Sequence, residues 1–283
     1  MIKVKHILII CILALFASCG KDNSSPIDPG WNNPGDSRAD ELIVMSYNIK
    51  HCAPYYGTSE TTVANVNSIA TIIKSKKPDV VFLQEVDKCT TRSLGIDQAK
   101  KIAELSGYPY YYFYKSMDYQ GGEYGLAILS SISIKDAFGY KLPKTIDEVS
   151  IAGEYVVGTA KIHRNSKDIM IAVAHLSVYQ AERDKQMPYI LNNILTKDIP
   201  TIFAGDFNAT PTNSTIQFLN GAEFTRTNTN SLNYTIPSNA PNREIDYISY
   251  KPSTAFSTIS HTVLTGLNAS DHLPIISILK ITK

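Results

Sequence analysis

The sequence lacks a strong excess of charge of either sign. Its 283 residues carry 27 basic and 26 acidic side chains. Proteins that hold long nucleic-acid duplexes through phosphate contacts usually carry a clear positive excess or a basic stripe, and no such stripe is evident here. The balance of charge therefore argues against a protein whose main task is to grip a long duplex.

A hydrophobic run long enough to span a membrane is also missing. Residues 7–16 form an apolar run of about ten residues, well short of the roughly 20 that a bilayer requires. The run follows Lys3 and Lys5, a combination typical of a cleaved signal peptide. Removal of these two lysines leaves 25 basic against 26 acidic residues, a net charge near −1.

The end of this apolar run indicates lipid attachment. Residues 16–20 read Phe-Ala-Ser-Cys-Gly and resemble a bacterial lipobox, in which the cysteine becomes the diacylated first residue of the mature protein. We expect residues 1–19 to be a signal peptide and Cys19 to carry the lipid. The protein would then be exported and anchored to the bacterial cell envelope, on its periplasmic or its cell-surface face. An ordinary cleaved signal is the alternative, because Phe16 stands where the motif prefers leucine.

Internal repeats and a second linker are missing as well. Residues 20–40 are rich in Pro, Gly, Ser, Asn and Asp and have almost no apolar side chains, a composition typical of a flexible tether. Residues 41–283 have ample apolar content for one sizeable core. We therefore predict one folded domain. We also expect a monomer, although the sequence carries no signal for the oligomeric state.

Within this domain, apolar runs alternate with helical patterns. Val63, Val66, Ile69 and Ile73 recur at helical spacing, and that helix ends at 76–78. Strands are predicted at 42–47, 79–83, 110–114, 124–130, 155–162, 168–175, 202–205, 245–250, 260–265 and 274–281, and further helices at 97–106 and 179–196. The mixture suits two packed sheets with helices outside, although an open mixed sheet fits the periodicity equally well.

Polar side chains stand at the ends of the predicted strands, where a rigid sheet can direct them into one cleft. They are Asn48, Glu85, His175, Asp206, Asn208, Asp246, Asp271 and His272. Each has an ordinary alternative explanation as a turn former, a helix cap or a solvated charge. Together, the carboxylates, amides and histidines suit a hard divalent cation with oxygen ligands, assisted by acid–base groups.

Five ordered motifs carry a resemblance to a known family. They are Ser46-Tyr47-Asn48-Ile49, Leu83-Gln84-Glu85-Val86, Gly205-Asp206-Phe207-Asn208, Ile245-Asp246-Tyr247-Ile248 and Ser270-Asp271-His272-Leu273-Pro274. In this order they resemble the signature of the endonuclease/exonuclease/phosphatase superfamily. Asp87, Arg92-Ser93 and residues 121–125 further resemble its bacterial branch of metal-dependent hydrolases, although Leu126 replaces the asparagine common there. The resemblance implies the four-layer α/β sandwich of deoxyribonuclease I, with two mixed sheets flanked by helices.

The resemblance also implies roles for individual residues. Glu85 would be the main metal ligand, with Asn48 and Asp271 on or near the metal, which we expect to be Mg²⁺, with Mn²⁺ or Ca²⁺ as alternatives. Asp246 would fix the ring of His272. The other roles fall on Asp206 and Asn208, which would orient water and phosphate, and on His175, which would assist the leaving group. Either Asp206 or His272 would be the general base, and the number of metals stays open.

Other polar residues carry weaker indications. Arg92 could clamp a phosphate bidentately or be a solvated loop residue, and Tyr124 either lines the cleft or packs in the core. Arg183 and Gln186 are interpreted as structural. The expected substrate is a phosphate ester: nucleic acid, a nucleotide, a phospholipid head group or a sugar phosphate. A non-catalytic surface lipoprotein that uses the same fold to bind a ligand is the alternative function.

Cysteine is scarce, and its spacing suggests one hypothesis. Cys11 and Cys19 belong to the signal segment, which leaves Cys52 and Cys89 in a compartment where disulfides persist. Each lies four residues after a proposed metal-site residue at the end of a predicted strand. We therefore hypothesise a disulfide between Cys52 and Cys89 beside the cleft, with two free thiols as the alternative.

Overall fold

A computed structural model describes residues 38–228 and 233–282 of the chain. The predicted signal peptide, the lipid-anchor cysteine Cys19 and almost all of the predicted tether lie outside these described residues. Within the described ranges, no helix is long and apolar enough to cross a membrane.

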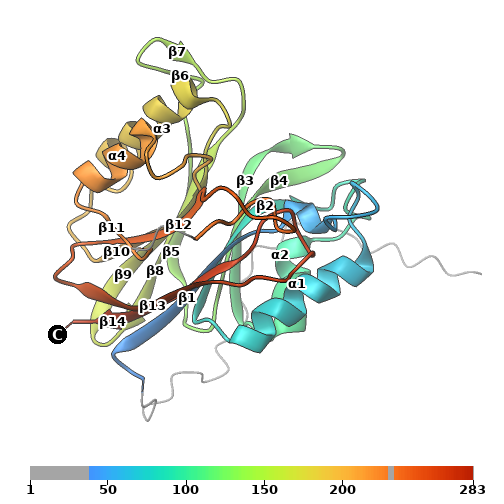
Figure 1. The fold of residues 1–283 in the computed structure, drawn as a ribbon, viewed down its shortest axis with the longest axis horizontal. Coiled ribbons are helices and arrows are strands. Elements are labelled where there is room, and N and C mark those ends of the chain that lie inside the picture. Colours follow the sequence, from blue (N-terminus) through green and yellow to red (C-terminus); the bar gives the residue numbers. More distant parts are fainter. Residues whose placement is uncertain (1–37, 229–232, 283) are drawn as a thin grey trace, which may run out of the picture.

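Two six-stranded mixed sheets pack face to face, with helices on their outer faces (Figure 1). Sheet A has the order β13 (Phe256–Val263), β14 (Ile275–Ile281), β1 (Glu41–Asn48), β2 (Val80–Lys88), β4 (Gly122–Ser130) and β3 (Tyr110–Tyr119). Sheet B has the order β11 (Thr225–Arg226), β12 (Asp246–Lys251), β10 (Thr201–Asp206), β9 (Lys167–His175), β8 (Val156–Arg164) and β5 (Lys135–Lys141). The four-layer α/β sandwich is confirmed.

The helices α1 (Val63–Lys76) and α2 (Gln98–Ser106) cover sheet A, whereas α3 (Gln180–Asn193) and α4 (Ser214–Gly221) cover sheet B (Figure 1). Local chemistry sets their ends. The side chain of Thr62 accepts a hydrogen bond from the Asn65 amide at the start of α1, and Asp97 does the same for Lys100 at the start of α2. Gly107 ends α2 in the left-handed conformation.

Burial on both faces explains why the strands are continuous apolar runs. In β1, Leu42 and Val44 belong to the core between the two sheets, whereas Met45 and Tyr47 pack into the layer beneath α1 and α2. A third apolar layer lies between sheet B and the pair α3 and α4. The three layers fix both sheets rigidly, and that rigidity is what positions the side chains at the strand ends.

Several short elements were not predicted from the sequence. They are β5, the hairpin of β6 (Thr145–Ile146) and β7 (Val149–Ser150), α4, and β11. The edge strand β5 has only exposed or half-exposed residues, so it carries no apolar pattern that could reveal it.

The parallel pairs direct the important strand ends to one edge. Strand β1 runs parallel to β2, and β9 runs parallel to β10. The carboxyl ends of parallel strands meet at the same edge of a sheet. The polar ends of β1, β9 and β10 therefore lie along one side of the sandwich, and Glu85 lies beside the end of β1, at a bulge within β2 rather than at its end.

Candidate active site

In sheet B, three predicted residues stand side by side in register. Asp206 at the end of β10 is paired with His175 on one side and with Asp246 at the start of β12 on the other. The preceding residue must be glycine, because a Cβ on Gly205 would overlap the backbone carbonyl of Ala174 and its φ is +149°. The backbone thus sets a row of two carboxylates and one imidazole.

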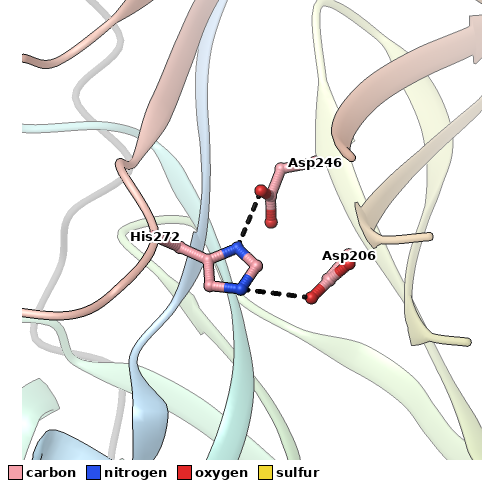
Figure 2. Close-up of side chains that lie close together, drawn as sticks. All are labelled: Asp206, Asp246 and His272. Carbon is pink, nitrogen blue, oxygen red and sulfur yellow. Dashed lines mark hydrogen bonds and ion pairs between the residues drawn. The ribbon is translucent and has the colours of Figure 1, made fainter. Parts of the chain in front are cut away.

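His272 enters this row from the loop before β14 and lies between the two carboxylates (Figure 2). Its Nδ1 is 2.9 Å from Asp246 Oδ2, and its Nε2 is 3.6 Å from Asp206 Oδ2. Burial by itself would lower the pKa of His272, but the charges of Asp246 and Asp206 outweigh it and raise this pKa to about 10. The two carboxylates therefore favour the protonated ring, and both of its nitrogens face a carboxylate.

Asn48, at the end of β1, joins the two sheets. Its Nδ2 donates to Glu85 Oε1 and to Asp206 Oδ2, each at 3.0 Å, while its Oδ1 accepts from the backbone amide of Lys50. The side chain is completely buried. One amide thus ties the proposed metal ligand Glu85 to the carboxylate row of sheet B.

His175 and Asn208 complete the sheet B side. His175 Nε2 lies 3.4 Å from Asp206 Oδ2 and 3.1 Å from Asn208 Nδ2. Asn208 also donates to the carbonyl of Leu176, and its backbone amide donates to Asp206 Oδ1. Two polar side chains thus flank Asp206 on the side away from Asp246, both partly exposed.

Asp271 lies at the rim, next to the end of β1, which carries Asn48. Ser270 donates to the backbone carbonyl of Asn48 and lies 3.3 Å from Asp271 Oδ1. Lys50 Nζ is 4.0 Å from Asp271 Oδ2, and the Asp271 side chain is one-third exposed. The structure therefore brings seven of the eight predicted strand-end residues into one contiguous network and places Asp271 at its edge.

A profile of the family described as the Endonuclease/Exonuclease/phosphatase family matches residues 45–272. This chain belongs to that family. A comparison with curated proteins finds no significant match.

Solved structures share the fold of this endonuclease/exonuclease/phosphatase family member. A family protein from Beutenbergia cavernae is 21% identical with a TM-score of 0.71, covering 86% of this chain and 72% of its own. The mannosyl-6-phosphatase of Bacteroides thetaiotaomicron is 20% identical with a TM-score of 0.67, covering 84% and 99%. The catalytic domain of human nocturnin, solved with a bound sulfate anion, is 21% identical with a TM-score of 0.66, covering 86% and 94%. At these identities the likeness establishes the fold.

Arg92 and Tyr124, the predicted substrate-binding residues, lie together. Arg92 donates through Nε and Nη2 to the two carboxylate oxygens of buried Asp87, at 2.8 and 2.9 Å. Its guanidinium also lies over the rings of Tyr119 and Tyr124, 4.4 and 5.6 Å from their centroids. Arg92 is therefore fixed by Asp87, which leaves only part of its donor set for a ligand.

Tyr124 borders the active site from the sheet A side. Burial raises the pKa of its hydroxyl, and the nearby carboxylate of Glu85 adds to this effect. Together with His175, Tyr124 lines a cavity of about 190 Å³ whose other walls include Met117, Tyr155 and Val178. This arrangement agrees with the interpretation that Tyr124 lines the cleft.

Arg183 and Gln186 on α3 hold the loop that follows His175. Arg183 Nη1 donates to the carbonyls of Ser177 and Val178, and Gln186 Oε1 accepts from the Ser177 amide. Their partners are backbone groups, as expected for the structural role predicted for them.

The hypothesis of a disulfide between Cys52 and Cys89 is wrong for this structure, in which Cys52 is a free, buried thiol. Cys52 belongs to a left-handed turn with a φ of +57° and packs in the apolar layer beneath α1 and α2. That burial raises its pKa far above the ordinary range of a thiol. Equal spacing after two strands does not make two side chains point at each other.

The donor groups fit a divalent cation on the Glu85 side of the site. Among the described residues, Asp206, Asp246 and His272 are the one group of three acidic, histidine or cysteine side chains whose donor atoms lie within 4.8 Å of one another. There, however, Nδ1 of His272 is hydrogen-bonded to Asp246 and Nε2 faces Asp206, so neither ring nitrogen is free for an ion. The carboxylate of Glu85 is 26% exposed and offers oxygen atoms suited to a hard cation.

One histidine of the site was not singled out from the sequence. His51 follows Asn48 by three residues, and its Nδ1 lies 4.0 Å from Glu85 Oε2. The sequence signal was only a histidine shortly after a strand end, which does not show where its ring points.

Proposed function

We propose that this protein is a divalent-metal-dependent hydrolase of phosphate esters, acting as a phosphodiesterase or phosphatase. The observation that carries the proposal is the His272 ring held between Asp246 and Asp206, with Asn48 linking that row to Glu85. Endonucleases, exonucleases and phosphatases all hydrolyse phosphate esters, and the family match covers every residue of this network.

His272 would act as a fixed positive charge and hydrogen-bond donor. Its Nδ1 is engaged by Asp246, and its Nε2 faces the position beside Asp206 where a phosphate oxygen would come. A ring that carries hydrogen on both nitrogens cannot accept a proton. We therefore assign to Asp206 the role of general base, since its Oδ2 lies beside His272, His175 and Asn48.

Asn208 and His175 would serve the phosphate and the leaving group. Asn208 can donate to a phosphate oxygen without adding a group that titrates near neutral pH. His175 is partly exposed at the mouth of the cavity lined by Tyr124, a position from which it can donate to the departing oxygen. Glu85, together with Asn48 and Asp271, would hold the cation, which supplies charge neutralisation to the phosphate and the leaving oxygen.

The test is hydrolysis by the purified protein with Mg²⁺, Mn²⁺, Ca²⁺ or excess chelator. The panel contains bis-p-nitrophenyl phosphate, p-nitrophenyl phosphate, plasmid DNA, RNA, a nucleotide, sphingomyelin and sugar phosphates. We expect turnover that the chelator abolishes and that a Glu85→Ala, His272→Ala double variant lacks. A folded wild-type protein that turns over none of these substrates and binds no cation would instead be a ligand-binding protein.

We also propose that the protein is exported and attached to the cell envelope through a lipid on Cys19. The support is the sequence of residues 16–20 after an apolar run. Mass spectrometry of the protein isolated from its own membranes should show a mature chain that begins at a diacylated cysteine. A chain that begins at another residue, without lipid, would contradict this proposal.

A further inference from the structure

His51 lies in the 3₁₀ turn η1 (Lys50–Cys52), directly after the strand end that carries Asn48. Its side chain is only 9% exposed, yet its Nδ1 lies 4.0 Å from Glu85 Oε2. That separation is too long for a hydrogen bond between the two atoms. The pair therefore faces each other across a narrow gap at the proposed cation site.

The contacts of His51 fix which ring nitrogen has a lone pair. Its Nε2 lies 2.9 Å from the backbone carbonyl of Ser59, which can only accept, so Nε2 carries the hydrogen. In the neutral ring Nδ1 is then an acceptor. Among the described residues this buried Nδ1 has no hydrogen-bond partner. A histidine that donates one nitrogen to a carbonyl and leaves the other free has the arrangement of metal-ligating histidines.

The backbone is strained at both members of the pair. Lys50, His51 and Cys52 all have positive φ, and so does Glu85, at +55°. Non-glycine residues keep this conformation only where their surroundings enforce it, and such residues cluster at functional sites. Here Thr61 Oγ1 and Gln98 Nε2 both donate to the carbonyl of His51 and hold the turn in place.

We propose that His51 Nδ1 and Glu85 Oε2 bind the same divalent cation, an inference that rests on the proposed function and assigns it a nitrogen ligand. Imidazole nitrogens and carboxylate oxygens lie about 2.0–2.2 Å from such an ion, so two ligand atoms on it are roughly 3.0–4.2 Å apart. The observed 4.0 Å falls within that range. Asn48 donates its NH₂ group to Glu85 and Asp206 and so orients both carboxylates beside the ion.

A nitrogen ligand changes which cation the site prefers. Imidazole suits Zn²⁺, Fe²⁺ and similar transition-metal ions, whereas Mg²⁺ prefers oxygen ligands and retained water. The structure therefore assigns to this protein a preference for a transition-metal ion over Mg²⁺, and His51 is the residue that confers it.

The test is pulsed electron paramagnetic resonance of Mn²⁺ bound to the purified full-length protein, read for coupling to an imidazole nitrogen. We expect coupling in the wild type and its loss in His51→Gln, with Mn²⁺ affinity at least about tenfold lower and Mg²⁺ affinity changed much less. His175→Gln, which alters another histidine of the site, and His163→Gln, at an exposed histidine paired with Asp168, should keep the coupling.

A second measurement needs no variant and covers the case in which His51→Gln fails to fold. In protein labelled with ¹⁵N-histidine, Zn²⁺ should shift the Nδ1 resonance of His51, whose Nε2 is hydrogen-bonded to the carbonyl of Ser59. Bound Mn²⁺ without nitrogen coupling, or coupling that survives in His51→Gln, would overturn the inference while chelator-sensitive turnover still supported the proposed function. Turnover unaffected by chelator, with no cation bound, would overturn the metal dependence itself.

Discussion

The two sides of the site contain similar side chains in opposite states. On the sheet B side, Asp206 and Asp246 are 1% and 3% exposed, and the two nitrogens of His272 face them. On the sheet A side, Glu85 is partly exposed and His51 has a buried nitrogen without a partner among the described residues. We name these the proton side (Asp206, Asp246, His272) and the cation side (Asn48, His51, Glu85).

The difference shows how one cleft can separate two tasks. On the proton side the ring of His272 is already held between two carboxylates before any ligand arrives, and such preorganisation costs nothing at the moment of reaction. The cation side has negative charge and a free lone pair that only a positive ligand would complete. Activity lost through a substitution on the cation side should therefore recover at high metal concentration, whereas activity lost through a substitution on the proton side should not.

The largest effect is expected from His272→Gln. This change leaves two buried carboxylates without the cation between them, and removing one member of a buried ion pair typically costs about 3–5 kcal/mol of stability. We expect kcat/KM to fall by roughly 10³-fold, with no recovery at high metal concentration. Steady-state kinetics and urea unfolding measure both quantities, with His163→Gln as the control that should change neither.

Glu85→Gln should produce a large loss of a different kind. The amide can still accept from Asn48 but carries no charge, so we expect metal affinity to fall at least about tenfold and turnover to recover partly at high Mn²⁺. Stability should change by less than about 1 kcal/mol, because the side chain is partly exposed. Titration calorimetry and metal-dependent rates provide the check. Activity that stayed abolished at saturating metal would erase the distinction between the two sides.

Asp246→Asn should weaken the proton side without removing the ring. Asp246 makes the largest contribution that raises the pKa of His272 to about 10, so its loss lowers that pKa. His272 then releases its proton at a lower pH, and the alkaline limb of the profile of kcat/KM against pH moves to lower pH. We expect a loss of about 10²-fold at pH 7. An alkaline limb that stayed in place would show that the His272 charge does not control the rate.

The smallest effect concerns a half-buried histidine outside the site. His261 has hydroxyl partners, Thr227 and Ser277, and burial lowers its pKa to about 4. Because the unfolded state binds this proton below about pH 6.5 and the folded state does not, its contribution to stability is lost as pH falls from about 6.5 towards 4. His261→Gln should flatten unfolding free energy against pH in that window. If the slope of unfolding free energy against pH did not change, the proton taken up on unfolding would belong to a group other than His261.

The strand ends were predictable because parallel neighbours align them. Asn48, Asp206 and His175 follow apolar runs that the sequence shows clearly, and the pairing of β9 with β10 then brings His175 and Asp206 into register. The two-sheet architecture itself came from the resemblance, since periodicity fits an open sheet as well. Strand β5 was not predicted because it is an exposed edge strand. Without a buried face, its sequence shows no alternation of apolar and polar residues.

The sequence-based predictions that failed concern the direction in which side chains point. His51 and Cys52 lie in a left-handed turn, and no propensity predicts three consecutive non-glycine residues with positive φ. That turn directs His51 towards Glu85 and Cys52 into the apolar layer, so the same backbone feature hid the additional site residue and misled the disulfide hypothesis.

The position of β14 in sheet A has a consequence for how the molecule is made. This strand, at residues 275–281, lies between β1, at residues 41–48, and β13. As a ribosome extends the chain, β1 has no partner on that side until more than two hundred further residues have emerged. His272 arrives just before β14, so completion of the sheet and completion of the reactive centre coincide. A nascent or prematurely terminated chain therefore lacks both, and no partly synthesised form carries an assembled centre.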